Sequence, residues 1–137
     1  MKKGTRRGAL LIALMLAMLA VGGVALAAQL RGTNGPDDIK GTGNNDTIRG
    51  LAGNDRLKGL GGADKMWGDS GSDGLYDGQL VEKSKDRLYG GVGDDFFNTQ
   101  NEPHSPDIVY CGRGFDTWWA DPKDKYIGER CEKVRVR

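Results

Sequence analysis

Residues 32–76 read GTNGPDDIK GTGNNDTIR GLAGNDRLK GLGGADKMW GDSGSDGLY when this stretch is divided into nines. In each of these units position one is glycine, position six is aspartate and position eight is isoleucine, leucine or methionine. With aspartate at about one residue in nine, five consecutive matches by chance have a probability on the order of one in a hundred thousand. The stretch is therefore a repeat array, and each position of the nonapeptide has its own structural role.

The same register continues towards the C-terminus. The unit at 77–89, DGQLVEKSKDRLY, carries four extra residues, and GGVGDDFFN at 90–98 returns to nine. Both insertions, at 78–85 and 99–105, precede even-numbered aspartates of the series, so we expect them to project from one edge of the fold. The later pairs of position six and position eight are Asp86 with Leu88, Asp95 with Phe97, Asp107 with Val109, Asp116 with Trp118, and Asp124 with Tyr126.

The last three positions of each unit predict a very short strand. They alternate polar, apolar and polar residues, as in Thr47-Ile48-Arg49, which is typical of a strand with one buried face. The first six positions are rich in glycine and asparagine, which accept positive φ and favour a turn. Because one unit is too short to close a coil, the pattern predicts an all-β, right-handed parallel β-roll with two nonapeptides per coil.

This arrangement would stack carboxylates. Residues 18 apart would lie at the spacing between strands, roughly 4.8 Å, so Asp37 would stack with Asp55 and Asp73, and Asp46 with Asp64. Carboxylates at this distance repel each other unless a cation lies between them. Calcium fits best, because it takes six to eight oxygen ligands in tolerant geometry, whereas Mg²⁺ is stricter and Zn²⁺ would lack clustered histidine or cysteine ligands.

The units resemble the RTX-type, or hemolysin-type, calcium-binding nonapeptide G-G-x-G-x-D-x-U-x over residues 32–98. Residues 90–95 match its first six positions fully, whereas other units lack the second glycine and one has Asn44 at position four. The C-terminal tail, with Tyr110-Cys111-Gly112 and Cys131-Glu132-Lys133-Val134, also resembles the ends of small secreted bacterial calcium-binding repeat proteins. The resemblance implies a β-roll that binds Ca²⁺ in its turns. It further implies that the position-six aspartates are metal ligands: Asp37, Asp46, Asp55, Asp64, Asp73, Asp86 and Asp95.

The N-terminus predicts export. Four basic residues precede an apolar stretch at 9–24, and Ala25-Leu26-Ala27 suits signal peptidase, so residues 1–27 form a predicted signal peptide with a helical core. An uncleaved membrane anchor is the alternative; both place the remainder outside the cytoplasm, secreted or at the cell surface. Removing the signal takes away four of the 20 basic residues and none of the 19 acidic ones, leaving a net charge of −3 that argues against nucleic acid as a partner.

The C-terminal residues predict a cap on the roll. We divide the chain outside the signal into a calcium-binding roll at 28–98 and degenerate repeats with an aromatic cap at 99–137. Cys111 and Cys131 are the two cysteines, and in an oxidising compartment a disulfide between them is the simplest prediction, with two reduced buried thiols as the alternative. Trp118 and Tyr126 fall on the inward column and would cap the roll, whereas Trp119 falls outward and could stack on a sugar.

The sequence favours calcium binding coupled to folding over catalysis. The single histidine, His104, lies in an insertion, and neither a G-x-S-x-G nor an H-E-x-x-H motif is present. We therefore expect no enzyme activity, no cofactor besides Ca²⁺ and no membrane span after signal cleavage. One alternative is a calcium-dependent adhesin for a cell-surface glycan or protein. A less favoured alternative is a glycosidase-like hydrolase, which would need only two carboxylates.

Overall fold

The computed structural model describes residues 26–78, 83–101, 105–128, 131 and 133–136. Residues 1–25, which hold nearly all of the predicted signal peptide and its helix, lie outside the described residues, as does His104. The described residues include no helix of the length and apolar character that crossing a bilayer requires.

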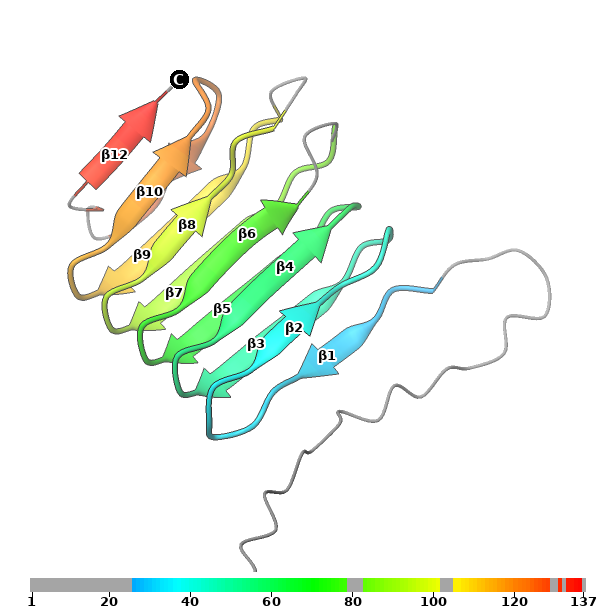
Figure 1. The fold of residues 1–137 in the computed structure, drawn as a ribbon. Helices are drawn as coiled ribbons and strands as arrows, with labels where there is room; N and C mark the ends of the chain where they lie inside the picture. Colours follow the sequence, from blue (N-terminus) through cyan, green and yellow to red (C-terminus); the bar gives the residue numbers. More distant parts are fainter. Residues whose placement is uncertain (1–25, 79–82, 102–104, 129–130, 132, 137) are drawn as a thin grey trace, which may run out of the picture.

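The described chain winds into two parallel sheets that face each other (Figure 1). Sheet A contains β1 (Gln29–Arg31), β3 (Thr47–Ala52), β5 (Lys65–Ser70), β7 (Arg87–Val92), β9 (Ile108–Arg113) and β11 (Lys125–Tyr126). Sheet B contains β2 (Asp38–Lys40), β4 (Arg56–Leu60), β6 (Gly74–Gly78), β8 (Phe96–Asn98), β10 (Thr117–Ala120) and β12 (Lys133–Val136). Successive strands alternate between the sheets, which confirms a parallel β-roll with two nonapeptides per coil.

The strand register follows the length of the repeat. Thr47 pairs with Lys65, 18 residues later, in the regular coils. Lys65 pairs with Arg87 and Arg87 with Ile108, so the coils with insertions are longer. The connections from β6 to β7 and from β8 to β9 both run from sheet B to sheet A, so the described residues that flank the two insertions lie on one edge of the roll, as predicted.

Position eight supplies the core, as predicted. Seven consecutive position-eight side chains are fully buried between the sheets, at 0% exposure: Ile48, Leu57, Met66, Leu75, Leu88, Phe97 and Val109. Trp118 continues the column at 2% exposure, but Tyr126, paired in register with Val109, is 45% exposed. Among the described residues β11 ends sheet A, so no later strand covers Tyr126, whose ring instead makes an edge contact with Trp118.

A disulfide closes the C-terminal end of the roll. It joins Cys111, buried on β9, to Cys131, with 5.6 Å between their Cα atoms. β12 then pairs with β10 at the end of sheet B. The predicted disulfide is thus confirmed, and the alternative of two reduced thiols is wrong.

Candidate metal centre

The position-six aspartates form two ladders, one along each edge of the roll. The first ladder lies in the turns that lead from sheet A to sheet B, and the second lies in the turns that lead back (Figure 1). The first ladder contains Asp37, Asp55, Asp73, Asp95 and Asp116, and the second contains Asp46, Asp64, Asp86, Asp107 and Asp124. The structure therefore separates the seven predicted ligands into two stacks.

In every ladder aspartate except the first of each ladder, one carboxylate oxygen accepts the backbone N–H of the preceding ladder aspartate. Asp37 donates its backbone N–H to Oδ1 of Asp55 at 2.9 Å, and Asp55 donates to Asp73 at 2.8 Å. The second ladder repeats this pattern, beginning with the N–H of Asp46 and Oδ1 of Asp64 at 2.7 Å. These bonds run along the stack and fix the orientation of each carboxylate.

The other carboxylate oxygen has no such partner in the middle of the ladders. Within the described residues, Oδ2 is buried without a hydrogen-bond partner in Asp55, Asp73, Asp86 and Asp95. All four side chains are at most 3% exposed, so water does not replace the missing partner at the protein surface. Since a buried charged oxygen without a partner is costly, these atoms are suited to a bound cation.

The first coil differs from the later ones because threonine occupies position two there. Thr33 donates its backbone N–H and its hydroxyl to Oδ2 of Asp37, at 2.6 and 3.0 Å. Thr42 makes the same two bonds to Asp46, at 2.5 and 3.0 Å. Asp37 and Asp46 are therefore partly satisfied by the protein itself, which sets them apart from the other predicted ligands.

Position one is glycine because the oxygen atoms crowd against it. A Cβ on Gly68 would clash with Oδ2 of Asp73 and lie 2.7 Å from the carbonyl oxygen of Gly90 in the next coil. At Gly50 the Cβ would clash with Oδ2 of Asp55 and lie 2.9 Å from the carbonyl oxygen of Gly68. A carboxylate and a carbonyl oxygen thus converge beside each of these glycines, which is the mixed oxygen donor set that Ca²⁺ prefers.

Burial also affects the protonation of the ladders. Removal from water raises the pKa of Asp95 to about 7, and the charges of Asp73 and Asp116 add to the effect, whereas the bond from the Asp73 N–H opposes it. The pKa values of Asp55 and Asp73 are raised mainly by the same loss of hydration. The cause is a row of like charges held in a dry interior, which a divalent cation would relieve.

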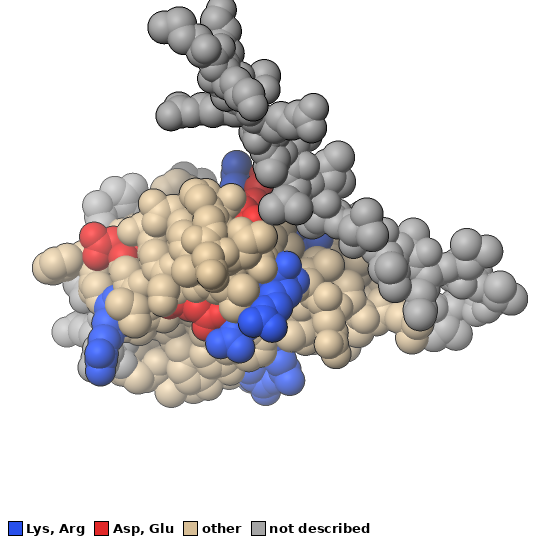
Figure 2. Space-filling model, turned by 90° about the horizontal axis from the view of Figure 1, so that it is seen from below, with Lys and Arg blue, Asp and Glu red and all other residues tan. Residues whose placement is uncertain are grey.

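Basic side chains do not neutralise the ladders in the part of the chain described here. The recorded ion pair there joins Arg49 to Asp69 at 2.5 Å, and neither residue belongs to a ladder. On the face shown in Figure 2, acidic atoms cover only small areas among basic and uncharged side chains. This surface agrees with the burial of the ladder carboxylates inside the roll.

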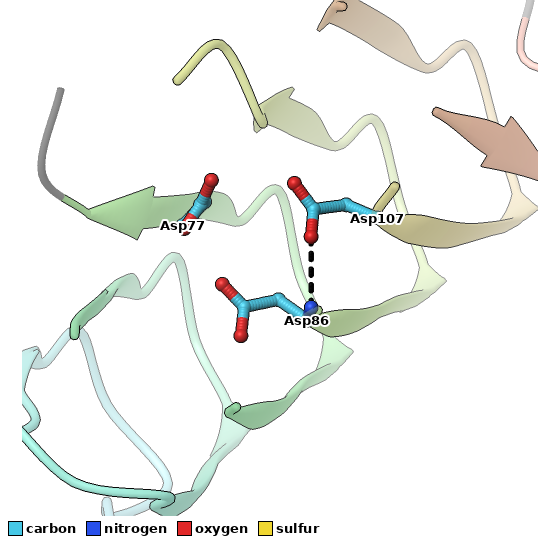
Figure 3. A group of neighbouring side chains, drawn as sticks. All are labelled: Asp77, Asp86 and Asp107. Carbon is cyan, nitrogen blue, oxygen red and sulfur yellow. Dashed lines mark hydrogen bonds between the residues drawn. The ribbon is translucent and has the colours of Figure 1, made fainter. Parts of the chain in front are cut away.

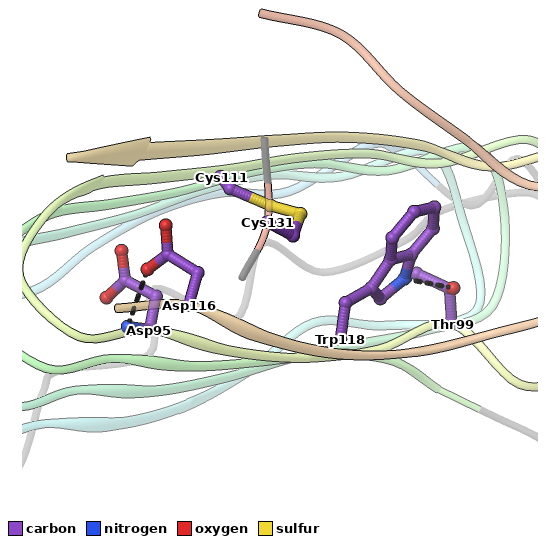
Figure 4. The surroundings of a disulfide bond; sticks show 6 residues. All are labelled: Asp95, Thr99, Cys111, Asp116, Trp118 and Cys131. Carbon is purple, nitrogen blue, oxygen red and sulfur yellow. Dashed lines mark hydrogen bonds between the residues drawn. A yellow bond between two sulfur atoms is a disulfide. The ribbon is translucent and has the colours of Figure 1, made fainter. Parts of the chain in front are cut away.

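The predicted ligand set stopped at Asp95, whereas the ladders continue to the C-terminal cap. Asp116 accepts the backbone N–H of Asp95 at 2.9 Å, next to the disulfide and to Trp118, whose indole N–H donates to Thr99 (Figure 4). Asp107 accepts the N–H of Asp86 at 2.8 Å. The signal for both was already present in the aspartate-x-apolar pairs that follow the insertions.

Asp77 was missed altogether. It occupies position one, which is glycine in the five preceding units, and its side chain is 1% exposed. The break in the glycine column was the available sequence signal. Its carboxylate lies close to those of Asp86 and Asp107 (Figure 3).

Comparison with known families agrees with this geometry. The family described as RTX calcium-binding nonapeptide repeat (4 copies) matches residues 29–52, 40–75 and 83–100. No curated protein and no solved structure matches the chain.

Proposed function

Residues 29–75 and 83–100 belong to the RTX calcium-binding nonapeptide repeat family, and on this premise we propose that the protein is an exported calcium-binding protein whose roll folds as the ions bind. One observation carries the proposal: the buried Oδ2 atoms of Asp55, Asp73, Asp86 and Asp95, which lack a hydrogen-bond partner within the described residues. Calcium would supply the missing positive charge.

The proposed ligands are the ladder aspartates at both edges of the roll. They are the seven residues expected from the sequence, Asp37, Asp46, Asp55, Asp64, Asp73, Asp86 and Asp95, extended by Asp107 and Asp116. Carbonyl oxygens of position-one residues, such as Gly68 and Gly90, would complete the coordination, since they lie beside the carboxylates of the preceding coil. Asp37 and Asp46 would contribute least to calcium binding, because Thr33 and Thr42 already donate hydrogen bonds to their Oδ2 atoms.

Folding would be coupled to metal binding for two physical reasons. Each nonapeptide buries one apolar side chain, which offsets little of the entropy lost when a glycine-rich backbone is ordered. The stacked carboxylates also repel each other when they are charged. A cation therefore adds favourable energy to the folded chain alone, so metal binding and folding become one equilibrium.

Circular dichroism tests this proposal. In EDTA the protein should be largely disordered, and adding Ca²⁺ should produce β structure, while Mg²⁺ at equal concentration should do much less. A spectrum that is already folded in EDTA and does not respond to calcium would contradict the coupling. Isothermal titration then measures binding directly, so that a folded protein without calcium affinity is recognised as well.

Export is the part of the proposal that rests on the N-terminal sequence. We propose cleavage after Ala27 and release to the outside, where calcium is plentiful enough to fill weak sites. Mass spectrometry of the protein from the culture medium would identify its first residue. Recovery of the intact chain in the membrane fraction would favour the uncleaved anchor instead.

Calcium-dependent adhesion is a second candidate, because aromatic side chains form rows on the outer faces of the roll. Trp67, Tyr89 and Tyr110 stack on sheet A, with ring centroids 5.0 and 4.4 Å apart, and on sheet B Phe96 contacts Trp119, which is 37% exposed. Such side chains can stack on sugars. Retention on glycan or cell-wall material in calcium but not in EDTA would support adhesion, and we propose no catalytic activity.

A further inference from the structure

The second ladder changes its construction where Asp77 replaces the position-one glycine. In the preceding coil of the same ladder, a Cβ on Gly59 would clash with Oδ2 of Asp64 and lie 2.6 Å from the carbonyl oxygen of Asp77. A side chain at position one is thus directed towards the aspartate of its own turn. For Asp77 that aspartate is Asp86, and the extra carboxylate enters the interior of the roll at 1% exposure.

Three carboxylates meet at this point. Asp77, Asp86 and Asp107 each offer an oxygen, and these oxygens all lie within 4.8 Å of one another (Figure 3). Two oxygens on opposite sides of a calcium ion, each about 2.4 Å from it, are roughly 4.8 Å apart. The spacing of the cluster therefore suits a calcium ion without rearrangement of the backbone.

The hydrogen bonds around the cluster orient its oxygens and leave two of them available. The side-chain amide of Asn101 donates to Oδ2 of Asp77 at 2.6 Å and to Oδ2 of Asp107 at 3.0 Å. Backbone N–H groups occupy Oδ1 of Asp86 and Oδ1 of Asp107, at 2.6 and 2.8 Å. Oδ1 of Asp77 and Oδ2 of Asp86 are buried and have no hydrogen-bond partner within the described residues.

The charge of the cluster requires compensation. Asp77, Asp86 and Asp107 are 1%, 1% and 0% exposed, so solvent does not screen the three carboxylates from one another. Hydrogen bonds from one amide and two backbone groups do not offset three negative charges in a dry interior. A bound divalent cation would do so, and it would also connect β6 of sheet B to the turns that precede β7 and β9 of sheet A.

We propose that Asp77, Asp86 and Asp107 form a discrete calcium site, of higher affinity than the regular turns, which is filled first when the roll folds. This inference rests on the proposed function, since it takes Ca²⁺ as the ion. The regular turns offer one carboxylate beside each position-one glycine, whereas this site has the additional carboxylate of Asp77. Because affinity rises with the number of charged ligands, we expect it to bind calcium about 10-fold or more tightly than the other sites.

The test compares Asp77→Asn with two matched variants that carry the same chemical change. Asp38→Asn alters an exposed aspartate outside both ladders, and Asp55→Asn alters a regular site of the first ladder. Isothermal titration of the purified protein with Ca²⁺ should resolve a tight phase in the wild type, in Asp38→Asn and in Asp55→Asn. Asp77→Asn should lose that phase and retain the weaker ones.

A second substitution guards against a failure to fold. Asp77→Gly restores the glycine found at position one of the regular units, so it should keep the roll at saturating calcium, judged by circular dichroism, and still lose the tight phase. If Asp77→Asn or Asp77→Gly titrates like the wild type, the site proposed here is wrong while the turn sites stand. If the wild type binds no calcium, both this inference and the proposed function are overturned.

Discussion

Replacing Gly68 by alanine tests the crowding of oxygen atoms that defines the ladders. The new Cβ would clash with Oδ2 of Asp73 and lie 2.7 Å from the carbonyl oxygen of Gly90 and 2.9 Å from Cγ of Asp73. Of these atoms the carbonyl belongs to the backbone of the neighbouring coil and cannot move alone. We therefore expect the carboxylate of Asp73 to be displaced from the position in which it would face a cation.

Gly43→Ala is the matched control. Gly43 is exposed, and a Cβ built on it meets no atom within 4 Å. Neither Gly43 nor Gly68 has a positive φ, so both substitutions restrict the unfolded chain to a similar degree. That restriction alone should stabilise Gly43→Ala by about 0.4–1 kcal/mol.

The difference between the two variants isolates the clash. The gain from restricting the unfolded chain cancels between the two variants, and overpacking of a dense interior costs about 1–3 kcal/mol, so Gly68→Ala should be less stable than Gly43→Ala by roughly 1–3 kcal/mol. Thermal melts in saturating Ca²⁺ should then differ by on the order of 10 °C. The calcium concentration at the folding midpoint should rise for Gly68→Ala only.

Equal melting temperatures and equal calcium midpoints for the two variants would refute the reasoning. Such a result would mean that Oδ2 of Asp73 does not lie against Gly68 in solution. Because metal binding and folding are proposed to be one equilibrium, a lower melting temperature with an unchanged calcium midpoint would contradict that coupling.

Three further perturbations address the ladders and the cap. Burial raises the pKa of Asp95 in the folded state to about 7, above its ordinary value of 3.8, so the contribution of this group to stability is present at low pH and is lost as the pH rises through about 7. Circular dichroism in EDTA should therefore show more residual β structure at pH 5 than at pH 8, and the opposite order would contradict this. Replacing Cys111 and Cys131 together by serine should lower stability by about 3 kcal/mol, because the disulfide closes a loop with a sequence separation of 20; denaturant melts in calcium measure it, and an unchanged midpoint would count against the closure. Asp73→Asn should reduce calcium binding more than Asp37→Asn, since Thr33 already satisfies Oδ2 of Asp37; equal losses in titration calorimetry would argue against that distinction.

Much of the fold could be predicted because it is periodic and local. A turn, a short strand and one inward side chain are encoded within nine residues, so the column from Ile48 to Val109 and the two aspartate ladders could be found by counting. The predicted three-residue strands were too short, since interior strands such as β3 (Thr47–Ala52) continue into the first positions of the next unit. The insertions did not disturb the register, since an aspartate and an apolar residue two positions later follow each of them, at Asp86 with Leu88 and at Asp107 with Val109. The exposure of Tyr126 was not predictable from its column, because it depends on whether a later strand covers it.

The sequence by itself determined the nonapeptide period, the parallel roll with two units per coil, the inward column and the alternation of aspartates between two edges. Tertiary structure decided which carboxylate oxygens still need a partner: position-two threonines satisfy Asp37 and Asp46, while Asp55 and Asp73 keep a buried oxygen without one. It also decided that Asp77 meets Asp86 and Asp107 across two insertions of different length. The physical reason is that strand pairing sets the spacing of the coils, whereas the surroundings of a buried charge depend on every chain segment that the coiling brings against it.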